Sequence, residues 1–190
     1  MGDYTIPAAS GESEYIEKRS SFIGRVMPVY SEDEAREFIE SIKKKHHDAR
    51  HNCWCYIIKD GPERYSDDGE PQGTAGIPMM EVFKKEGITN VVCVVTRYFG
   101  GILLGTGGLL RAYTKAAKDA LDAAGRKTVV PQKEFSLSCA YSDLEMYKKA
   151  IAAYGGQVLS VDYGADVSVH AEIPEEKFSG FDEKFLWSKK

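Results

Sequence analysis

One apolar run with a glycine-rich loop on either side is the feature that most constrains the fold of this chain. The run is Val91 to Val95, and it contains no polar residue. A strand with no polar face has to be covered on both sides, so we expect it to be buried in the middle of a sheet. The flanking loops, residues 66–76 and 96–108, are dense in glycine. Glycine is conformationally costly, so this density indicates tight turns or a ligand that approaches the backbone.

The second loop predicts a site for an anion, because it runs from the apolar strand directly into a helix predicted from about Leu109 to Ala124. The first turn of a helix offers unpaired N–H groups and a partial positive charge, and glycine lets an anion reach them. Basic side chains lie before this turn and along one face of the helix. The candidate residues for phosphate or the nucleic-acid backbone are Arg97, Gly100, Gly101, Gly105, Gly107, Gly108, Arg111 and Lys115.

A purely structural interpretation of the second loop stays open. A tight strand-to-helix turn followed by a solvated charged face explains the same residues, with Lys118 paired to Asp122 one turn further on. The glycine spacing matches neither a Walker A loop nor a dinucleotide fingerprint. Tyr98 and Phe99 can stack on bases, although such aromatic residues more often belong to a core.

The first loop supplies secondary candidates. Its carboxylates lie close in sequence to arginines, and such groups can bind Mg²⁺ or act as acid and base. They can equally cap the next helix, pair with Arg64 or form ordinary turns. The secondary candidates are Arg50, Arg64, Asp67, Asp68 and Glu70.

The histidines and cysteines do not form a recognisable zinc motif. Four ligands are required for a closed zinc site, and the group His46, His47, Asp48, His51, Cys53 and Cys55 has no second Cys or His pair downstream. Four cysteines in a chain of this size are no disulfide framework, so we expect them to fill core as small apolar groups. The common catalytic motifs of serine hydrolases, zinc proteases and cysteine nucleophiles are absent. We therefore assign no catalytic residue, no metal and no cofactor.

Periodicity predicts the remaining elements of a first domain, residues 1–130. Residues 15–29 form an extended segment or hairpin, and Ser31 with Glu34 predicts the start of a helix. Large residues on both faces of the segment 52–59 indicate an interior strand. Pro78 suits the first turn of a short helix that ends at Gly87.

A second domain is expected over residues 131–190, after a linker from Arg126 to Pro131. Its predicted order is a strand at 135–141, a helix that Ser142 and Glu145 would cap, a hairpin from 157 to 173, and a helix after Pro174. This order resembles a ferredoxin-like unit. The last strand is missing or reduced to Phe185-Leu186-Trp187, so the first strand would lie on an open sheet edge.

Net charge and hydropathy narrow the class of protein. The net charge of −4 argues against a protein that coats nucleic acid through bulk positive charge. No apolar run is long enough to span a bilayer, and the polar, acidic N-terminal segment does not resemble a secretory signal. We expect a cytoplasmic protein without a membrane partner.

Both loops, with residues 18–24 and 46–53, are similar to the IMPACT/YigZ family. The resemblance covers residues 14–125 strongly and the remainder more weakly. It implies an α+β protein whose first domain is a two-layer α/β unit with a left-handed βαβ crossover. That unit would be like the second domain of small-subunit ribosomal protein five and domain IV of elongation factor G. The second domain would be ferredoxin-like, as is domain V of that factor.

The same resemblance implies a role near RNA or the ribosome. Eukaryotic relatives regulate translation by competing for an activator of a stress kinase, through an extra domain that this sequence does not contain, so that activity does not transfer. We expect a non-catalytic RNA- or ribosome-associated protein, a translation-related regulator, with another protein as a further conceivable partner and no DNA specificity. The alternative is an enzyme or binder of a phosphorylated small molecule, by analogy with GHMP kinases, with Asp67, Asp68 or Glu70 as metal ligand or base.

Overall fold

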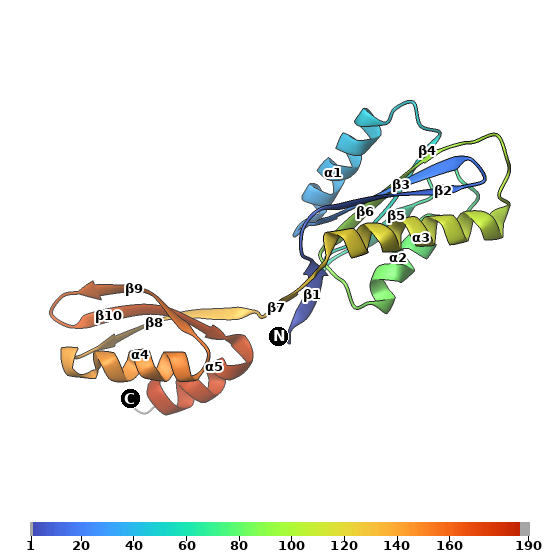
Figure 1. The fold of residues 1–190 in the computed structure, drawn as a ribbon. Coiled ribbons are helices and arrows are strands. Elements are labelled where there is room, and N and C mark those ends of the chain that lie inside the picture. Colours follow the sequence, from blue (N-terminus) through green and yellow to red (C-terminus); the bar gives the residue numbers. More distant parts are fainter. Residues whose placement is uncertain (1, 187–190) are drawn as a thin grey trace. The chain divides into compact units, whose positions relative to one another are not determined.

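The computed structural model describes residues 2–186, and the chain divides into two units, Tyr4–Thr128 and residues 129–186, with residues 2–3 grouped with the second. Both units mix helices with strands, and each has its own hydrophobic core (Figure 1). The predicted mixed α and β class and the presence of two units are confirmed.

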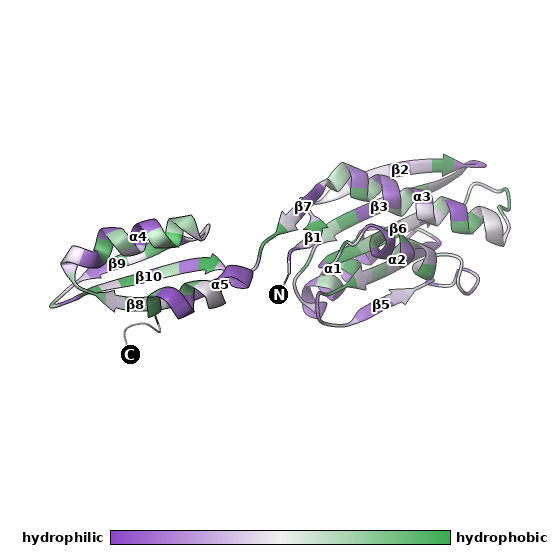
Figure 2. Ribbon diagram, turned by 90° about the horizontal axis from the view of Figure 1, so that it is seen from below, coloured by the Kyte–Doolittle hydropathy of each residue, from purple (hydrophilic) through white to green (hydrophobic). Residues whose placement is uncertain are grey.

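A five-stranded sheet forms the centre of the first unit, in the order β2-β3-β6-β4-β5. Its strands are β2 (Gly11–Glu17), β3 (Ser20–Pro28), β4 (His51–Ile57), β5 (Glu63–Ser66) and β6 (Val91–Tyr98). All neighbouring strands are antiparallel. The predicted hairpin and interior strand are β2–β3 and β4. Figure 2 shows that the edge strand β5 is hydrophilic.

The apolar run lies in β6, and helices cover both of its faces (Figure 1). Val92 and Val94 pack with α1 (Glu32–Lys45), while Val91, Cys93 and Val95 belong to the core beneath α2 (Gly76–Lys85) and α3 (Thr106–Ala124). Coverage on both sides is therefore confirmed. α1 adds a layer to the two-layer arrangement that we expected, because β6 presents apolar side chains to both faces.

Local sequence sets the start of α1 and the packing of α3. The Ser31 hydroxyl accepts a hydrogen bond from the Glu34 amide at 3.2 Å, which is the predicted N-cap contact. α3 lies very close to the β2–β3 hairpin. A Cβ at Gly11 or Gly24 would overlap backbone atoms of that helix. The facing side of α3 carries alanines, including Ala116 and Ala120, which are fully buried.

The predicted linker is wrong over most of its length. β7 (Arg126–Val129) pairs with β1 (Tyr4–Pro7) in a two-stranded sheet, and the amides of Ala8 and Ala9 donate to the carbonyls of Gly125 and Ala124. The segment is short and polar, so its own pattern indicates no strand. Its partner comes from the other end of the unit.

The second unit contains a three-stranded antiparallel sheet in the order β8-β10-β9, with helices between and after the strands. Its elements are β8 (Gln132–Cys139), the 3-10 turn Tyr141–Asp143, α4 (Leu144–Ala153), β9 (Gln157–Tyr163), β10 (Val167–Pro174), α5 (Glu175–Phe181) and the π-helix Asp182–Leu186. This is the predicted β-α-β-β-α order, with β8 at a sheet edge.

The end of the second unit agrees with the expectation of a missing last strand, whereas one predicted helix cap differs. Phe185 and Leu186 lie in the π-helix and pack against the core, so the described residues contain no fourth strand of this sheet; Trp187 lies outside them. The predicted capping pair Ser142 and Glu145 is wrong. A 3-10 turn precedes α4, and the Ser142 hydroxyl bonds to the Asp143 carboxylate instead of to a helix amide.

Candidate anion-binding site at the start of helix α3

The first turn of α3 is open to an anion. Gly105 is its N-cap residue, with a φ of 72° that favours glycine, and no side chain among residues 2–186 caps the turn. The first hydrogen bond of the helix runs from the Leu109 amide to the Gly105 carbonyl at 2.9 Å. Thr106 and Gly107 are exposed, so the amide groups of this turn are available to a ligand.

A cavity of about 350 Å³ adjoins this helix start. Gly105 and Thr106 line it together with residues that come from β4, β6 and both glycine-rich loops. One part of the lining is polar, namely Arg50, His51, Glu70 and Arg97; the other is mainly apolar, namely Pro71, Phe99, Leu103, Leu104 and Leu109.

Arg97 reaches the cavity from β6, but its charge is already compensated. Its Nη1 donates to Oε1 of Glu70 at 2.6 Å, and both side chains are buried. The Tyr113 hydroxyl donates to the same oxygen at 2.9 Å. The Nε atom of Arg97 is buried and has no hydrogen-bond partner among the described residues.

His51 and Arg50 complete the polar side. Nδ1 of His51 lies 2.8 Å from the carbonyl oxygen of Asp68. Because a carbonyl only accepts, Nδ1 carries the hydrogen, and Nε2 lies 3.9 Å from Oε1 of Glu70. Arg50 is exposed, and its guanidinium carbon lies 5.7 Å from the centre of the Phe99 ring.

Arg111 lies on another side of the same helix start. It lines a smaller cavity of about 130 Å³ with Lys18 and Gly108, and its Nη1 is close to Gly107. The structure thus brings Arg97 and Arg111 to neighbouring positions around one helix turn, but in two different cavities.

Gly100 and Gly101 serve the turn that precedes the site. The Gly100 amide donates to the Ser20 hydroxyl at 3.1 Å, and a Cβ at this position would overlap the backbone of Arg19. Gly101 has a φ of 86°. Both residues are explained by turn geometry, and neither lines the two cavities beside the helix start.

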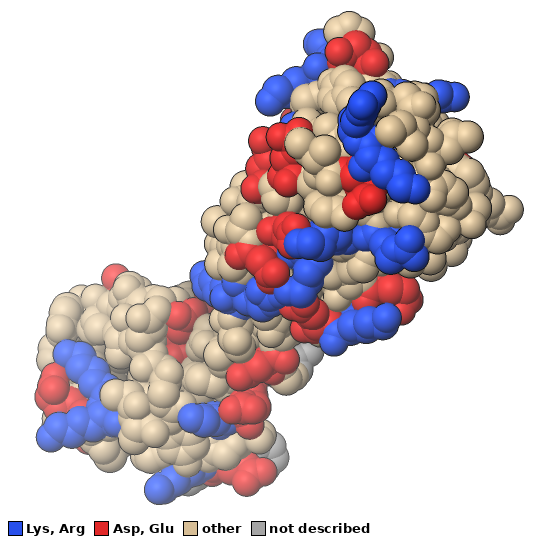
Figure 3. Space-filling view, turned by 45° about the vertical axis from the view of Figure 1, so that its right-hand side comes forward, with Lys and Arg blue, Asp and Glu red and all other residues tan. Residues whose placement is uncertain are grey.

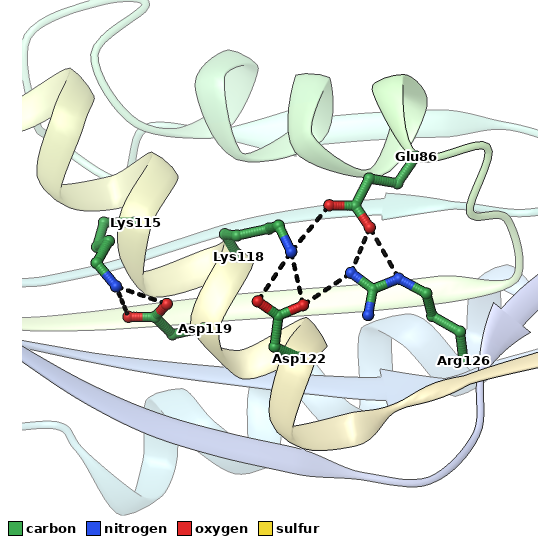
Figure 4. Close-up of polar contacts among 6 residues, drawn as sticks. All are labelled: Glu86, Lys115, Lys118, Asp119, Asp122 and Arg126. Atoms are coloured by element: carbon green, nitrogen blue, oxygen red, sulfur yellow. Dashed lines mark hydrogen bonds and ion pairs between the residues drawn. The ribbon is translucent and has the colours of Figure 1, made fainter.

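The lysines further along the basic face of α3 are paired with acids. The purely structural interpretation of this loop predicted one of these pairs, Lys118 with Asp122. Lys115 bonds Asp119, and Lys118 bonds both Asp122 and Glu86, which Arg126 also contacts (Figure 4). On the face drawn in Figure 3, acidic side chains are interspersed with lysines and arginines. Among the described residues that line the two cavities, the exposed cations without an ion-pair partner are therefore Arg50, Arg111 and Lys18.

The carboxylates of the first loop have structural partners. Asp67 accepts hydrogen bonds from the amides of Gly73, Ala75 and Gly76 at 2.8 to 3.0 Å, which caps the start of α2. Asp68 accepts from the Asn52 amide at 2.7 Å and lies 3.5 Å from Lys43. No group of three or more His, Cys, Asp or Glu residues in the part of the chain that the structure describes could hold a metal ion.

Arg64 and the cysteines lie apart from this site. Arg64 lines a separate cavity with Trp54 and Tyr56, on the α1 face of the sheet. All four cysteines are buried and none of them forms a disulfide within the described residues, as expected of small core residues. Burial raises the pKa of the Cys53 thiol, whose Sγ donates to the Asp67 carbonyl.

Sequence reasoning did not assign Thr106 or Tyr113 to the site. The signal for Tyr113 was a hydroxyl within an otherwise apolar helical stripe, since a buried Tyr usually finds a hydrogen-bond partner. Thr106 stands between two selected glycines, but nothing in its pattern distinguishes a cavity wall from an ordinary first helical residue.

Comparison with known proteins identifies both parts of the chain. The family model of the Impact N-terminal domain matches residues 18–121, and that of a domain of unknown function, DUF1949, matches residues 137–185. None of the described helices is both long and apolar enough to cross a membrane.

Individual relatives match over nearly the whole length. The IMPACT family member YvyE of Bacillus subtilis (strain 168) is 39% identical over 188 residues, which cover 96% of this chain and 85% of YvyE. YigZ of Escherichia coli (strain K12) is 36% identical, and the match covers 97% of this chain and 92% of YigZ. A crystal structure of "an hypothetical protein" is 35% identical, with a TM-score of 0.68 over 97% of this chain and 91% of that one. The chain therefore belongs to the IMPACT family.

Proposed function

We propose that this protein is a non-catalytic RNA- or ribosome-binding protein with a translation-related role, and that it holds phosphate groups at the start of α3. The observation that carries the proposal is the uncapped first turn at Gly105 and Thr106, which faces a cavity that also contains Arg50 and Arg97. Amide groups at a helix N-terminus and neighbouring guanidinium groups both favour phosphate oxygens. The family's likeness to translation-factor domains supports RNA or the ribosome as the source of the phosphates.

Only a few phosphate contacts are available in this site. Lys115 and Lys118 are paired with acids, and Arg97 is paired with Glu70. The exposed Arg50 and Arg111 therefore supply most of the charge. Each phosphate contact contributes a slope of about −0.7 to −0.9 to the dependence of log affinity on log salt. We expect a modest slope, of about −2, for this site.

A salt titration of binding to ribosomes and to structured RNA tests the proposal. Arg50→Ala combined with Arg111→Ala should weaken binding at low salt and flatten the slope by about two. Arg64→Ala is the matched control, because Arg64 is exposed and lies on the opposite face of the sheet. A slope that is flat in the wild type, or the same in both variants, contradicts the proposal. Arg97→Ala is less informative, since it leaves the buried Glu70 carboxylate unpaired.

The helix start itself is tested by a pair of variants at Gly107. A Cβ at this position meets only the Arg111 side chain, at 3.7 Å, so a small side chain fits. Gly107→Asp places a carboxylate over the amides and should abolish binding while the fold remains stable. Gly107→Asn has the same shape without the charge and should bind better than Gly107→Asp. Equal affinities of the two variants would place the phosphate elsewhere.

The alternative, catalysis or metal-assisted binding of a phosphorylated small molecule, gains no support from the three carboxylates. Asp67 and Asp68 bond backbone amides, and Glu70 bonds Arg97 and Tyr113. We do not favour it.

A further inference from the structure

The cavity beside α3 has an apolar side that phosphate binding does not use. Phe99 and Leu103 line it although they are 39% and 81% exposed, and Leu104 and Pro71 add further apolar surface. A site for phosphate alone needs amides and cations. Large apolar side chains left exposed beside polar groups indicate a ligand that has an apolar part as well.

The exposed aromatic ring lies next to two planar cations. The guanidinium carbons of Arg50 and Arg97 lie 5.7 and 5.5 Å from the centre of the Phe99 ring. Aromatic rings and arginine planes are the surfaces on which nucleobases stack in single-stranded nucleic acids. Arg50 is exposed and lies over the Phe99 ring, and we name these two side chains, which both line the cavity, the stacking platform.

Arg97 places an unsatisfied donor behind the wall of the same cavity. Arg97 is only 5% exposed, and its Nε has no hydrogen-bond partner among the described residues. A buried donor without a partner is costly. Because this atom is itself closed to solvent, a ligand reaches it only if the Arg97 side chain shifts.

We propose that the cavity binds one nucleotide, with its phosphate at the first turn of α3 and its base stacked on the platform of Phe99 and Arg50. The volume of about 350 Å³ lies within the range of small-ligand sites, about 300 to 1,000 Å³. The phosphate half of this inference rests on the proposed function, and the base subsite extends it. The nucleotide is either free or one unit of an RNA chain.

Calorimetric titration distinguishes the contribution of the phosphate to the affinity from that of the base. The probes are inorganic phosphate, adenosine, adenosine 5′-monophosphate and a short single-stranded oligoadenylate with a 5′-phosphate. The monophosphate should bind at least ten times more tightly than either phosphate or adenosine. Equal affinity for phosphate and for the monophosphate overturns the base subsite. Tighter binding of the oligonucleotide than of the monophosphate identifies an RNA chain as the source, and the reverse order identifies a free nucleotide.

A pair of variants tests the platform. Phe99→Leu keeps an apolar side chain but removes the ring, and it should weaken nucleotide binding by about 5- to 100-fold with the affinity for inorganic phosphate unchanged. Tyr30→Leu is the control, since Tyr30 is 58% exposed and does not line this cavity. An unchanged nucleotide affinity in Phe99→Leu overturns the proposal.

The outcomes for the base subsite and for the proposed function can be told apart. If structured RNA binds with the expected salt slope and Phe99→Leu binds nucleotide as the wild type does, the base subsite is wrong and the proposed function stands. If the monophosphate binds through Phe99 while ribosomes and RNA do not bind, the base subsite stands and the translation-related role is wrong.

Discussion

The ion pair between Arg97 and Glu70 is the most deeply buried charge pair near the candidate site, with both side chains less than 8% exposed. Removing one member of a buried pair leaves an uncompensated charge, which typically costs about 3 to 5 kcal/mol. We expect Glu70→Ala to lower the free energy of unfolding by that amount in denaturant titrations. Glu63→Ala, which breaks the exposed pair with Lys84, should cost much less, because solvent screens exposed ion pairs. Similar losses in the two variants would contradict this account.

Some buried groups keep their protons in the folded state at alkaline pH. We therefore expect the free energy of unfolding to fall at alkaline pH. Burial raises the pKa of the Cys53 thiol, the Cys55 thiol and the Tyr113 hydroxyl. In the unfolded chain, thiols lose their protons near pH 8.5. Above that pH the unfolded state binds fewer protons than the folded state. The free energy of unfolding should therefore fall as pH rises, by up to about 1.4 kcal/mol per pH unit for each thiol.

Denaturant titrations between pH 8 and pH 10 check this dependence. Cys53→Ala removes one of the buried thiols, so its free energy of unfolding should fall less steeply with pH than that of the wild type. An identical slope in the two proteins would show that Cys53 does not contribute.

At the scale of elements, α2 depends on Asp67, which lies in the loop before it. This carboxylate accepts from three amides around the helix start. Asp67→Ala should lower the free energy of unfolding by about 1 to 2 kcal/mol, the typical cost of a lost cap. Asp119→Ala, on the exposed side of α3, should change it much less. If Mg²⁺ stabilises the wild type but not Asp67→Ala, the loop has a metal-binding role that its hydrogen bonds do not suggest.

The elements that could be predicted from the sequence are those whose pattern of residues lies within the element itself or next to it. The hairpin, β4, β6 and the helices follow from alternation, from helical spacing and from the Ser31 cap, because these patterns lie within one segment. β7 was missed, since its partner β1 is at the far end of the unit. At the candidate site, Gly105, Gly107, Gly108 and Arg111 can be selected from the sequence because they lie at the start of the predicted helix, and their role stays a prediction. The pairing of Arg97 with Glu70 and Tyr113 was not predicted, because it joins three segments through contacts that no spacing reveals.

At the scale of the whole molecule, the division into two cores predicts that the parts fold separately. We propose residues 1–130 and 131–190 as the two domains, a boundary that keeps β7 with its partner β1. The fragment 1–130 should retain helical circular dichroism and a cooperative thermal transition. The fragment 131–190 should unfold at a lower temperature, because small domains bury a smaller fraction of their surface. Non-cooperative unfolding of 1–130 would contradict this division.

Because α3 packs closely on the β2–β3 hairpin, a change in the hairpin at Gly24 can affect the ligand cavity at the start of the helix. At Gly24 there is no room for even a methyl group against the carbonyl of Ala116. The same helix presents Gly105 and Thr106 to the cavity at its N-terminal end, while Ala116 lies near its middle. Any enlargement at Gly24 must lift or tilt the helix as a rigid rod, and the amides at its tip would move with it. The shape of the pocket is thus adjustable from Gly24, which lines neither cavity beside the helix start.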